Sequence, residues 1–215
     1  MNITEKGIII ILFSFVFNLS ANWITFQYDN NHSGFNPQAN IKLPLILKYT
    51  LNLESESINY SSAIICDKVI YIGLSNGKLK ALDLDTGLLK WEFITKGEIY
   101  VSSSIKNNTI YFGSTDGNLY ALNKDGNLKW KYYTGNNINS SPIVENENIY
   151  LGCNNGNIYA LNTNGNLLWK KEIGNYIWTS PALFKEKLVI GTINGIIYCL
   201  NSTNGNILWS YNLVI

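Results

Sequence analysis

The sequence is poor in several residue types that define common classes of protein. Its 215 residues include one histidine (His32), one methionine, four prolines and three cysteines. A single histidine excludes zinc sites that need two, such as those of HExxH peptidases and Cys2His2 fingers. Three cysteines cannot all pair within one chain, which excludes a small domain stapled only by internal disulfides.

Charged residues are also scarce, at 14% of the chain with a net charge of +1. A nearly neutral chain has no basic field to attract nucleic acid or an anionic membrane surface, so neither is expected as a partner. The sequence contains no Gly-x-Ser-x-Gly or Walker A motif. Serine-hydrolase and P-loop chemistry therefore have no support.

The abundant residues are 32 asparagines, 29 isoleucines, 17 glycines and 14 tyrosines. Isoleucine and tyrosine favour half-buried strands, whereas asparagine and glycine favour tight turns. The composition predicts an all-β protein with many short turns.

The N-terminus resembles a secretory signal peptide. Residues 7–17 are apolar and uncharged, which suits a signal core and is short for a membrane span of about 20 residues. Small residues near Ala21 predict cleavage there, giving a signal peptide over residues 1–21 and no membrane span in the mature chain. An uncleaved anchor is the alternative. No cysteine lies near the cleavage point, so no lipid anchor is expected, and the mature chain is expected in the periplasm, in the cell envelope or outside the cell.

Four internal repeats occupy the rest of the chain. Each ends one apolar run on a glycine, has a second glycine four residues later, and ends on a tryptophan. The first glycines are Gly73, Gly113, Gly152 and Gly191, and the tryptophans are Trp91, Trp130, Trp169 and Trp209. Each tryptophan precedes the next repeat's first glycine by 22 residues, so the length varies only in the turn before the tryptophan.

Each repeat is interpreted as four short antiparallel strands, with innermost strands beginning near Ser62, Ser102, Ser141 and Ser180. Four-stranded units of about 40 residues are typical of propeller blades. We therefore predict a β-propeller with blades over about 58–97, 98–135, 136–174 and 175–215, in preference to a solenoid. The Asn-Gly pair at Asn76 and its counterparts predicts type I′ hairpin turns.

Residues 22–57 form a lead-in with one predicted outer strand over residues 45–51. This strand has no incomplete blade to join, because the fourth repeat already contains its own outer strand. Three interpretations stay open: a fragment of a longer propeller, pairing with a second half-propeller, or a closed four-bladed ring. The first two predict an exposed apolar blade face.

The run 81–91, Ala-Leu-Asp-Leu-Asp-Thr-Gly-Leu-Leu-Lys-Trp, resembles the tryptophan-docking motif of quinoprotein-type propellers. Ser-Ser-Pro-Ile-Val at 140–144 and Thr-Ser-Pro-Ala-Leu at 179–183 resemble the PQQ-like repeat. This likeness implies one of two functions. The expected function is an exported, non-catalytic scaffold for a protein or envelope ligand, similar to the propeller lipoprotein of the outer-membrane β-barrel assembly machine and needing no cofactor. The alternative is a fragment of a PQQ-dependent dehydrogenase holding PQQ and Ca²⁺. That branch uses adjacent cysteines, whereas Cys66, Cys153 and Cys199 are far apart.

Two sets of candidate residues follow from the repeat, and no catalytic or metal-binding residue is predicted. One position enters each innermost strand and is expected to line the channel mouth, where aromatic side chains make good partner anchors or else cap the packing between blades. These residues are Tyr60, Tyr100, Asn139 and Trp178. The resemblance implies that Trp91, Trp130, Trp169 and Trp209 pack each blade against the next. The Asp83–Gly87 turn lacks the further oxygens of a calcium loop and is interpreted as turn geometry.

Overall fold

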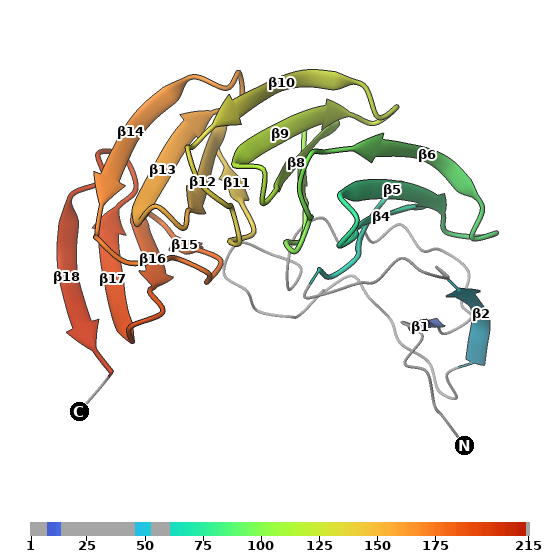
Figure 1. The fold of residues 1–215 in the computed structure, drawn as a ribbon, viewed down its shortest axis with the longest axis horizontal. Coiled ribbons are helices and arrows are strands. Elements are labelled where there is room, and N and C mark those ends of the chain that lie inside the picture. The colour runs from blue at the N-terminus through green and yellow to red at the C-terminus, as the bar shows by residue number, and fades with distance from the viewer. Residues whose placement is uncertain (1–7, 14–45, 53–60, 214–215) are drawn as a thin grey trace.

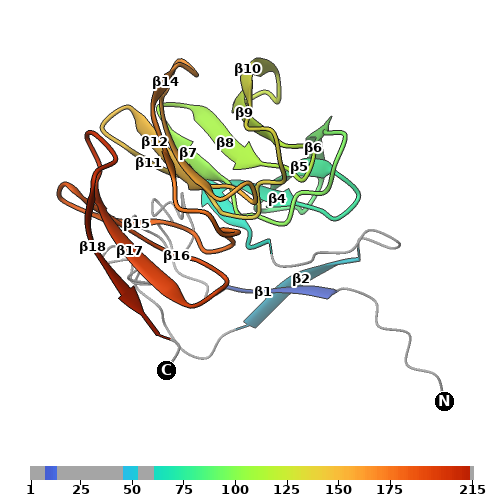
Figure 2. The same ribbon diagram turned by 60° about the vertical axis from the view of Figure 1, so that its left-hand side comes forward.

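The structure is a computed structural model that describes the backbone of residues 8–13 and 46–52 and all of residues 61–213. It contains four antiparallel four-stranded sheets, which confirms the predicted all-β propeller architecture. Figure 1 shows the sheets standing as blades in an arc, with one strand of each blade on the concave side and one on the convex side. The arc does not close within the described residues (Figure 2).

The blades follow one another in the sequence, and each runs from its inner to its outer strand. Blade one consists of β3 (Ile64–Cys66), β4 (Val69–Gly73), β5 (Lys78–Asp83) and β6 (Leu89–Ile94). Blade two consists of β7 (Ser104–Lys106), β8 (Thr109–Gly113), β9 (Asn118–Asn123) and β10 (Leu128–Tyr133). Blade three consists of β11 (Ile143–Glu145), β12 (Asn148–Gly152), β13 (Asn157–Asn162) and β14 (Leu167–Glu172). Blade four consists of β15 (Ala182–Phe184), β16 (Lys187–Gly191), β17 (Ile196–Asn201) and β18 (Ile207–Asn212).

The N-terminal part contributes a separate two-stranded ribbon. Strand β1 (Ile8–Phe13) pairs antiparallel with β2 (Ile46–Asn52), and β2 matches the predicted leading strand within one residue. Strand β1 lies inside the predicted signal peptide, whose removal stays a prediction. The predicted cleavage point lies outside the described residues.

The core consists of apolar layers between successive blades, because alternate residues of each strand point to opposite faces. In blade one, Tyr71, Ala81 and Trp91 share a row across the sheet and pack against blade two, where Ile110 and Phe112 are fully buried. Similar layers join blade two to blade three and blade three to blade four. We call the face of a blade that points to its successor the trailing face, and the opposite face the leading face.

The predicted type I′ turns at the Asn-Gly pairs are wrong. Gly77 has a φ of +80°, but Asn76 is not among the residues with positive φ, and the Gly77 N–H donates to the Leu74 carbonyl across a four-residue turn. Asn76 instead accepts a hydrogen bond from the Lys78 N–H through its side-chain oxygen at 3.2 Å. Asparagine therefore serves in this turn as a side-chain acceptor.

Paired positive φ angles occur in a different hairpin, between the first and second strands of three blades. Asp67 and Lys68 have φ angles of 49° and 61°, and the equivalent pairs are Asn107–Asn108 and Asn146–Glu147. In blade four only the first residue of the hairpin, Lys185, has a positive φ. None of these hairpins contains glycine, so the turn signal in the sequence pointed to the wrong loop.

Candidate functional site

The connecting loops that enter the inner strands are tied together around the arc by serine side chains. The Ser62 N–H donates to Ser102 Oγ at 3.0 Å, and the Ser102 N–H donates to Ser141 Oγ at 3.0 Å. The Ser141 N–H then donates to Ser180 Oγ at 3.1 Å. The predicted inner-strand starts thus lie two residues before the strands begin, and they form a ladder that sets the spacing of the loops.

The predicted mouth residues lie two positions before these serines. Tyr100 and Asn139 are half-buried, whereas Trp178 is 55% exposed; Tyr60 lies outside the described residues. Tyr176, on the same loop as Trp178, is 53% exposed. The ladder therefore places the loops bearing Tyr100, Asn139 and Trp178 side by side, but only the last of these side chains is freely accessible.

The side chain of Asn139 is half-buried, but its amide oxygen is fully buried and has no hydrogen-bond partner. The adjacent Ile138 is fully buried, and its Cγ2 would lie 2.2 Å from a Cβ placed on Gly113. The close fit of Ile138 against Gly113 holds this loop on the end of β8, which requires glycine at that strand end.

Tryptophans join the blades at their outer edge in a repeated geometry. The Nε1 atoms of Trp91, Trp130 and Trp169 donate to carbonyl oxygens of the following blade at 2.7, 2.9 and 2.8 Å. The acceptors are the carbonyl oxygens of Lys124, Thr163 and Ser202. Each ring also lies against a turn glycine of that blade. Those glycines are Gly126, Gly165 and Gly205.

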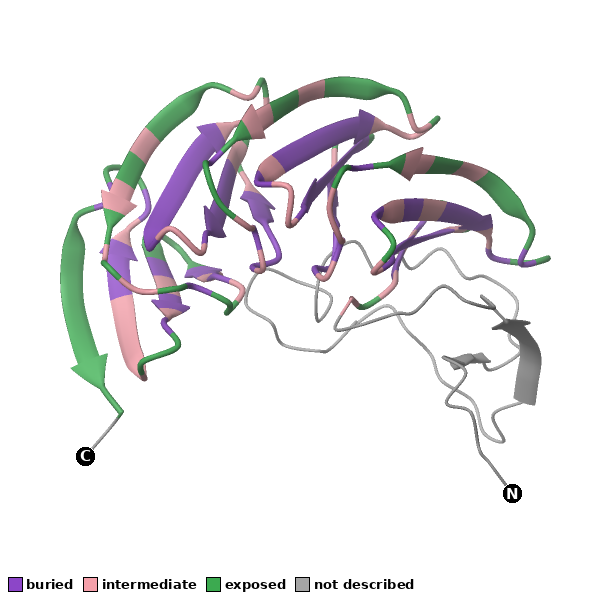
Figure 3. Cartoon of the chain, viewed as in Figure 1, coloured by how far each residue is buried: buried purple, intermediate pink, exposed green. Residues whose placement is uncertain are grey.

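Trp209 differs from the other three because the described residues contain no fifth blade. It is 47% exposed, and every residue of β18 is exposed, whereas the outer strands of the other blades alternate (Figure 3). The trailing face of blade four is therefore open. This agrees with the exposed apolar face expected for a partial or paired ring.

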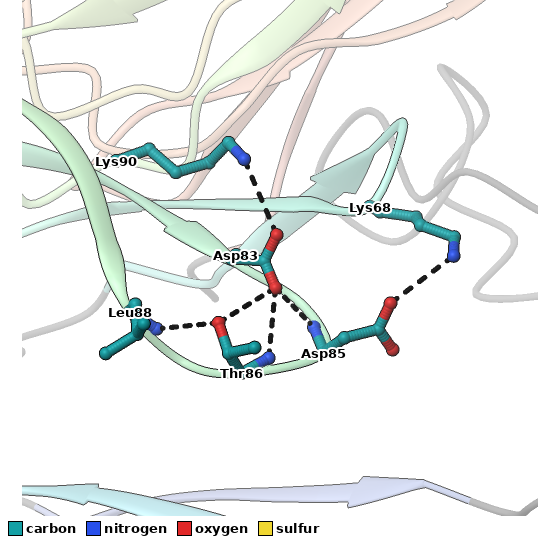
Figure 4. Close-up of polar contacts among 6 residues, drawn as sticks. All are labelled: Lys68, Asp83, Asp85, Thr86, Leu88 and Lys90. Atoms are coloured by element: carbon teal, nitrogen blue, oxygen red, sulfur yellow. Dashed lines mark hydrogen bonds and ion pairs between the residues drawn. The ribbon is translucent and has the colours of Figure 1, made fainter.

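The turn before each tryptophan is organised by one acidic or amide side chain. In blade one, Asp83 Oδ1 accepts hydrogen bonds from the Asp85 N–H, the Thr86 N–H and Thr86 Oγ1 at 3.0–3.1 Å (Figure 4). These bonds, with those to Thr86 first, lower the pKa of the Asp83 carboxyl below its usual value. Asn123, Asn162 and Asn201 make the corresponding bonds in the other blades. The side chain thus serves the turn itself, and the described residues contain no cluster of three or more acidic, histidine or cysteine side chains suited to a metal ion.

The three cysteines lie apart in three blades, and all are buried as free thiols. Burial is the main factor that raises the pKa of both the Cys66 and the Cys199 thiol. Cys199 pairs across the sheet with Trp209, at the position occupied by alanine in the other blades. All three cysteines serve as small packing residues in the core.

The sequence model of the family described as outer membrane protein assembly factor BamB matches residues 67–211. The chain belongs to this family. The match spans almost all of the four blades. No match was found among curated protein sequences.

Solved structures share the propeller fold at low sequence identity. Quinohemoprotein alcohol dehydrogenase from Comamonas testosteroni superimposes with a TM-score of 0.78 at 18% identity, covering 89% of this chain and 41% of that chain. BamB from Moraxella catarrhalis gives a TM-score of 0.55 at 18% identity, covering 77% of this chain and 64% of that chain. The computationally designed protein Ika8 gives 0.63 at 18% identity, covering 69% and 48%. This chain spans less than two thirds of the length of each of these three proteins.

The sequence interpretation did not single out one departure from the repeat, which lies on the trailing face of blade four. Tyr71, Tyr111 and Tyr150 pack beside their tryptophans, but the equivalent residue in blade four is Val189. This substitution is visible in the repeat itself and was a usable signal. Within the described residues, no helix is long and apolar enough to cross a membrane.

Proposed function

We propose that the protein is an exported, non-catalytic propeller scaffold that binds a protein or cell-envelope ligand through its inner loops. The observation that carries this proposal is the exposure of Trp178 and Tyr176 on the loop that enters blade four. Aromatic side chains held half-exposed on a rigid frame supply large contact areas at a low cost in side-chain entropy, and they are enriched at the centres of interfaces.

The frame around these aromatics supports the same proposal. Trp178 lies two residues before Ser180, whose Oγ accepts the hydrogen bond from the Ser141 N–H. Ile177, next to Trp178, is fully buried against Gly152. The backbone on both sides of Trp178 is therefore fixed, and a partner would not have to order this loop on binding.

Export is proposed on two grounds. The apolar segment over residues 7–17 suits a secretory signal. The matched family is named for an outer-membrane assembly factor, which supports a cell-envelope location.

A crosslinking experiment in cells tests the binding function. A photo-reactive residue placed at Trp178 or Tyr176 is expected to give discrete adducts with an envelope component, and adducts from position 176 should weaken at least about tenfold in a Trp178→Ala background. Tyr133, which is 66% exposed on the outer strand β10, is the matched control and should give none. Equal labelling from positions 133, 176 and 178 would refute the proposal.

A fragment of a PQQ-dependent dehydrogenase is the second candidate, favoured by the TM-score of 0.78 with a quinohemoprotein alcohol dehydrogenase. The residues present do not fit the quinone site implied by that resemblance. Cys66, Cys153 and Cys199 are buried in three different blades, so none can form the disulfide between adjacent cysteines used there. Stoichiometric binding of PQQ in the presence of Ca²⁺, followed by dye-linked alcohol oxidation, would establish this candidate over the scaffold.

A further inference from the structure

The trailing face of blade four carries an apolar surface that the other blades bury against a successor. Residue pairing across the sheet places Ala182, Val189, Cys199 and Trp209 in one row on this face. Phe184 and Tyr211 lie two residues further along their strands and therefore point to the same side. Phe184 and Tyr211 are each 63% exposed.

A groove crosses this face at the position that a tyrosine ring fills in the other three blades. In blade one, the fully buried Tyr71 lies 5.8 Å from the ring of Trp91, and blades two and three repeat this pair. Val189 replaces the tyrosine in blade four. The space left beside Trp209 is part of a shallow groove of about 530 Å³, which Phe184 and Lys187 also line.

The opposite end of the arc is closed. On the leading face of blade one, Ile70, Leu82 and Leu84 are 1–6% exposed and form their own buried cluster. A head-to-tail array of copies needs an open leading face to receive an open trailing face. Among the described blades, however, the open apolar face is that of blade four (Figure 3).

We infer that the trailing face of blade four binds the same face of a second copy of this chain, forming a two-fold symmetric dimer. One open face in each copy favours an isologous contact, which uses the same patch twice and stops at two subunits. The face carries both a projecting side chain, Phe184, and the groove beside Val189. A two-fold axis lets Phe184 of each copy enter the groove of the other, which provides the self-complementary shape that such contacts require.

The apolar area of this face matches what a stable dimer needs. A stable interface removes about 800 Å² from each partner, about 60% of it apolar, so each copy must supply roughly 500 Å². An aromatic side chain brings about 150–250 Å² when fully buried, so Phe184, Trp209 and Tyr211, about half exposed, supply roughly 300 Å². Leu213, Ile197 and Val189 supply much of the remainder. An exposed apolar patch of this size on a folded domain marks a contact surface.

Sedimentation of residues 22–215 between about 1 and 50 μM tests the dimer. The wild-type protein should sediment as a dimer. Phe184→Glu should weaken the dimer about 100-fold, because it removes the ring that fills the partner's groove and because desolvating a carboxylate costs free energy even beside Lys187. Tyr133→Glu, an equally exposed aromatic on blade two, should leave the dimer intact. Circular dichroism of both variants should match wild type, because both residues are exposed in the monomer.

Val189→Tyr provides a second variant that fills the groove without adding charge. It restores the tyrosine–tryptophan pair of the other blades and should weaken the dimer about tenfold or more by blocking entry of Phe184. A folded variant that dimerises as well as wild type would show that the groove is not used.

Cysteine crosslinking tests the symmetry. Lys187→Cys should trap a dimer through the same residue in both copies. Lys187 pairs with Phe184 and lies two residues from Val189, so it is close to the two-fold axis about which Phe184 enters the partner's groove. Lys131→Cys, on the exposed outer strand of blade two, is the control and should give no dimer. The native cysteines are 0–6% exposed and should not react.

This inference is independent of the proposed binding function, which uses the inner loops. A monomer at 50 μM, or a dimer insensitive to Phe184→Glu and lacking the Lys187 crosslink, would overturn the inference and leave the scaffold proposal standing. A monomer that binds another protein through Phe184 would also overturn it, because the occupant would not be a second copy. Loss of crosslinking at Trp178 would affect only the scaffold proposal.

Discussion

The indole Nε1 of Trp130 donates a hydrogen bond to the carbonyl oxygen of Thr163 at 2.9 Å, and the two residues are 33 positions apart. The Trp91–Lys124 and Trp169–Ser202 bonds have the same separation. The outer edge of each blade is therefore joined to the next by one polar bond and one aromatic contact. Trp209 ends this series in the described part of the chain, which makes it an internal reference for the other three.

Replacing Trp130 with phenylalanine keeps an apolar ring but removes the donor. We expect a loss of about 1 kcal/mol in the free energy of unfolding, because the Thr163 carbonyl oxygen loses its partner at a half-buried site. Trp178→Phe, at a tryptophan that is 55% exposed and lies outside the proposed dimer face, is the control and should change the unfolding free energy by less than about 0.5 kcal/mol. Urea denaturation of both variants measures the difference. Equal losses would show that the bond to Thr163 contributes nothing measurable.

Gly165→Ala should destabilise the protein by about 2–4 kcal/mol. Its φ of +86° disfavours any Cβ, and that Cβ would lie 2.8 Å from Cδ2 of Trp130. Gly174→Ala is the control, because its φ is +82° but nothing lies within 4 Å of the added atom. Gly174→Ala should therefore cost only the backbone term, about 1–2 kcal/mol. Thermal and urea unfolding of the pair separate backbone strain from the clash with the ring.

The repeat pattern was sufficient to predict the blades because each blade buries the same apolar rows against its neighbour. Strands β4, β8, β12 and β16 each end at the predicted glycine, and the outer strands each carry the predicted tryptophan. The turn type was not predictable in the same way. Asn76-Gly77 fits both a two-residue type I′ hairpin and the observed four-residue turn over residues 74–77. The choice between them depends on where the pairing of the two strands ends.

The candidate surfaces were predictable only in part. The sequence placed Tyr100, Asn139 and Trp178 at equivalent positions, but it could not show that only Trp178 is left exposed, since burial depends on whether another loop follows. The open face of blade four likewise depends on tertiary packing. Its sequence signal was Val189, which departs from the tyrosine of the other blades.

Asp116 predicts a pH dependence of stability. Burial opposes ionisation of its carboxyl, but hydrogen bonds from Tyr120, Asn118 and the Lys96 N–H outweigh burial and lower its pKa below 3.8. The stability contributed by the ionised form is therefore fully present above the unfolded pKa near 3.8, and it is lost as the pH falls through the lower folded pKa. In Asp116→Asn this contribution is absent at every pH.

Melting temperatures of wild type and Asp116→Asn between about pH 2 and 6 measure this effect. The two curves should be furthest apart above about pH 5 and should approach each other below pH 3.8. Tyr120→Phe removes the 2.6 Å bond from Tyr120 Oη to Asp116 and should give an intermediate slope. Parallel curves over the whole range would show that the Asp116 carboxylate does not stabilise the fold.

The hydroxyl of Ser141 is expected to stabilise the contact between the loops that enter blades two and three. Ser141 Oγ accepts the Ser102 N–H at 3.0 Å, and Ser102 is 2% exposed, so water cannot readily replace the lost acceptor. Ser141→Ala should cost about 1–3 kcal/mol of unfolding free energy and should increase hydrogen exchange at the Ser102 amide. Ser210→Ala, on the exposed outer strand β18, is the control and should change neither quantity. If Ser141→Ala leaves the Ser102 amide as protected as in wild type, the loops are held by apolar contacts such as Ile138 on Gly113, and the ladder only follows their spacing.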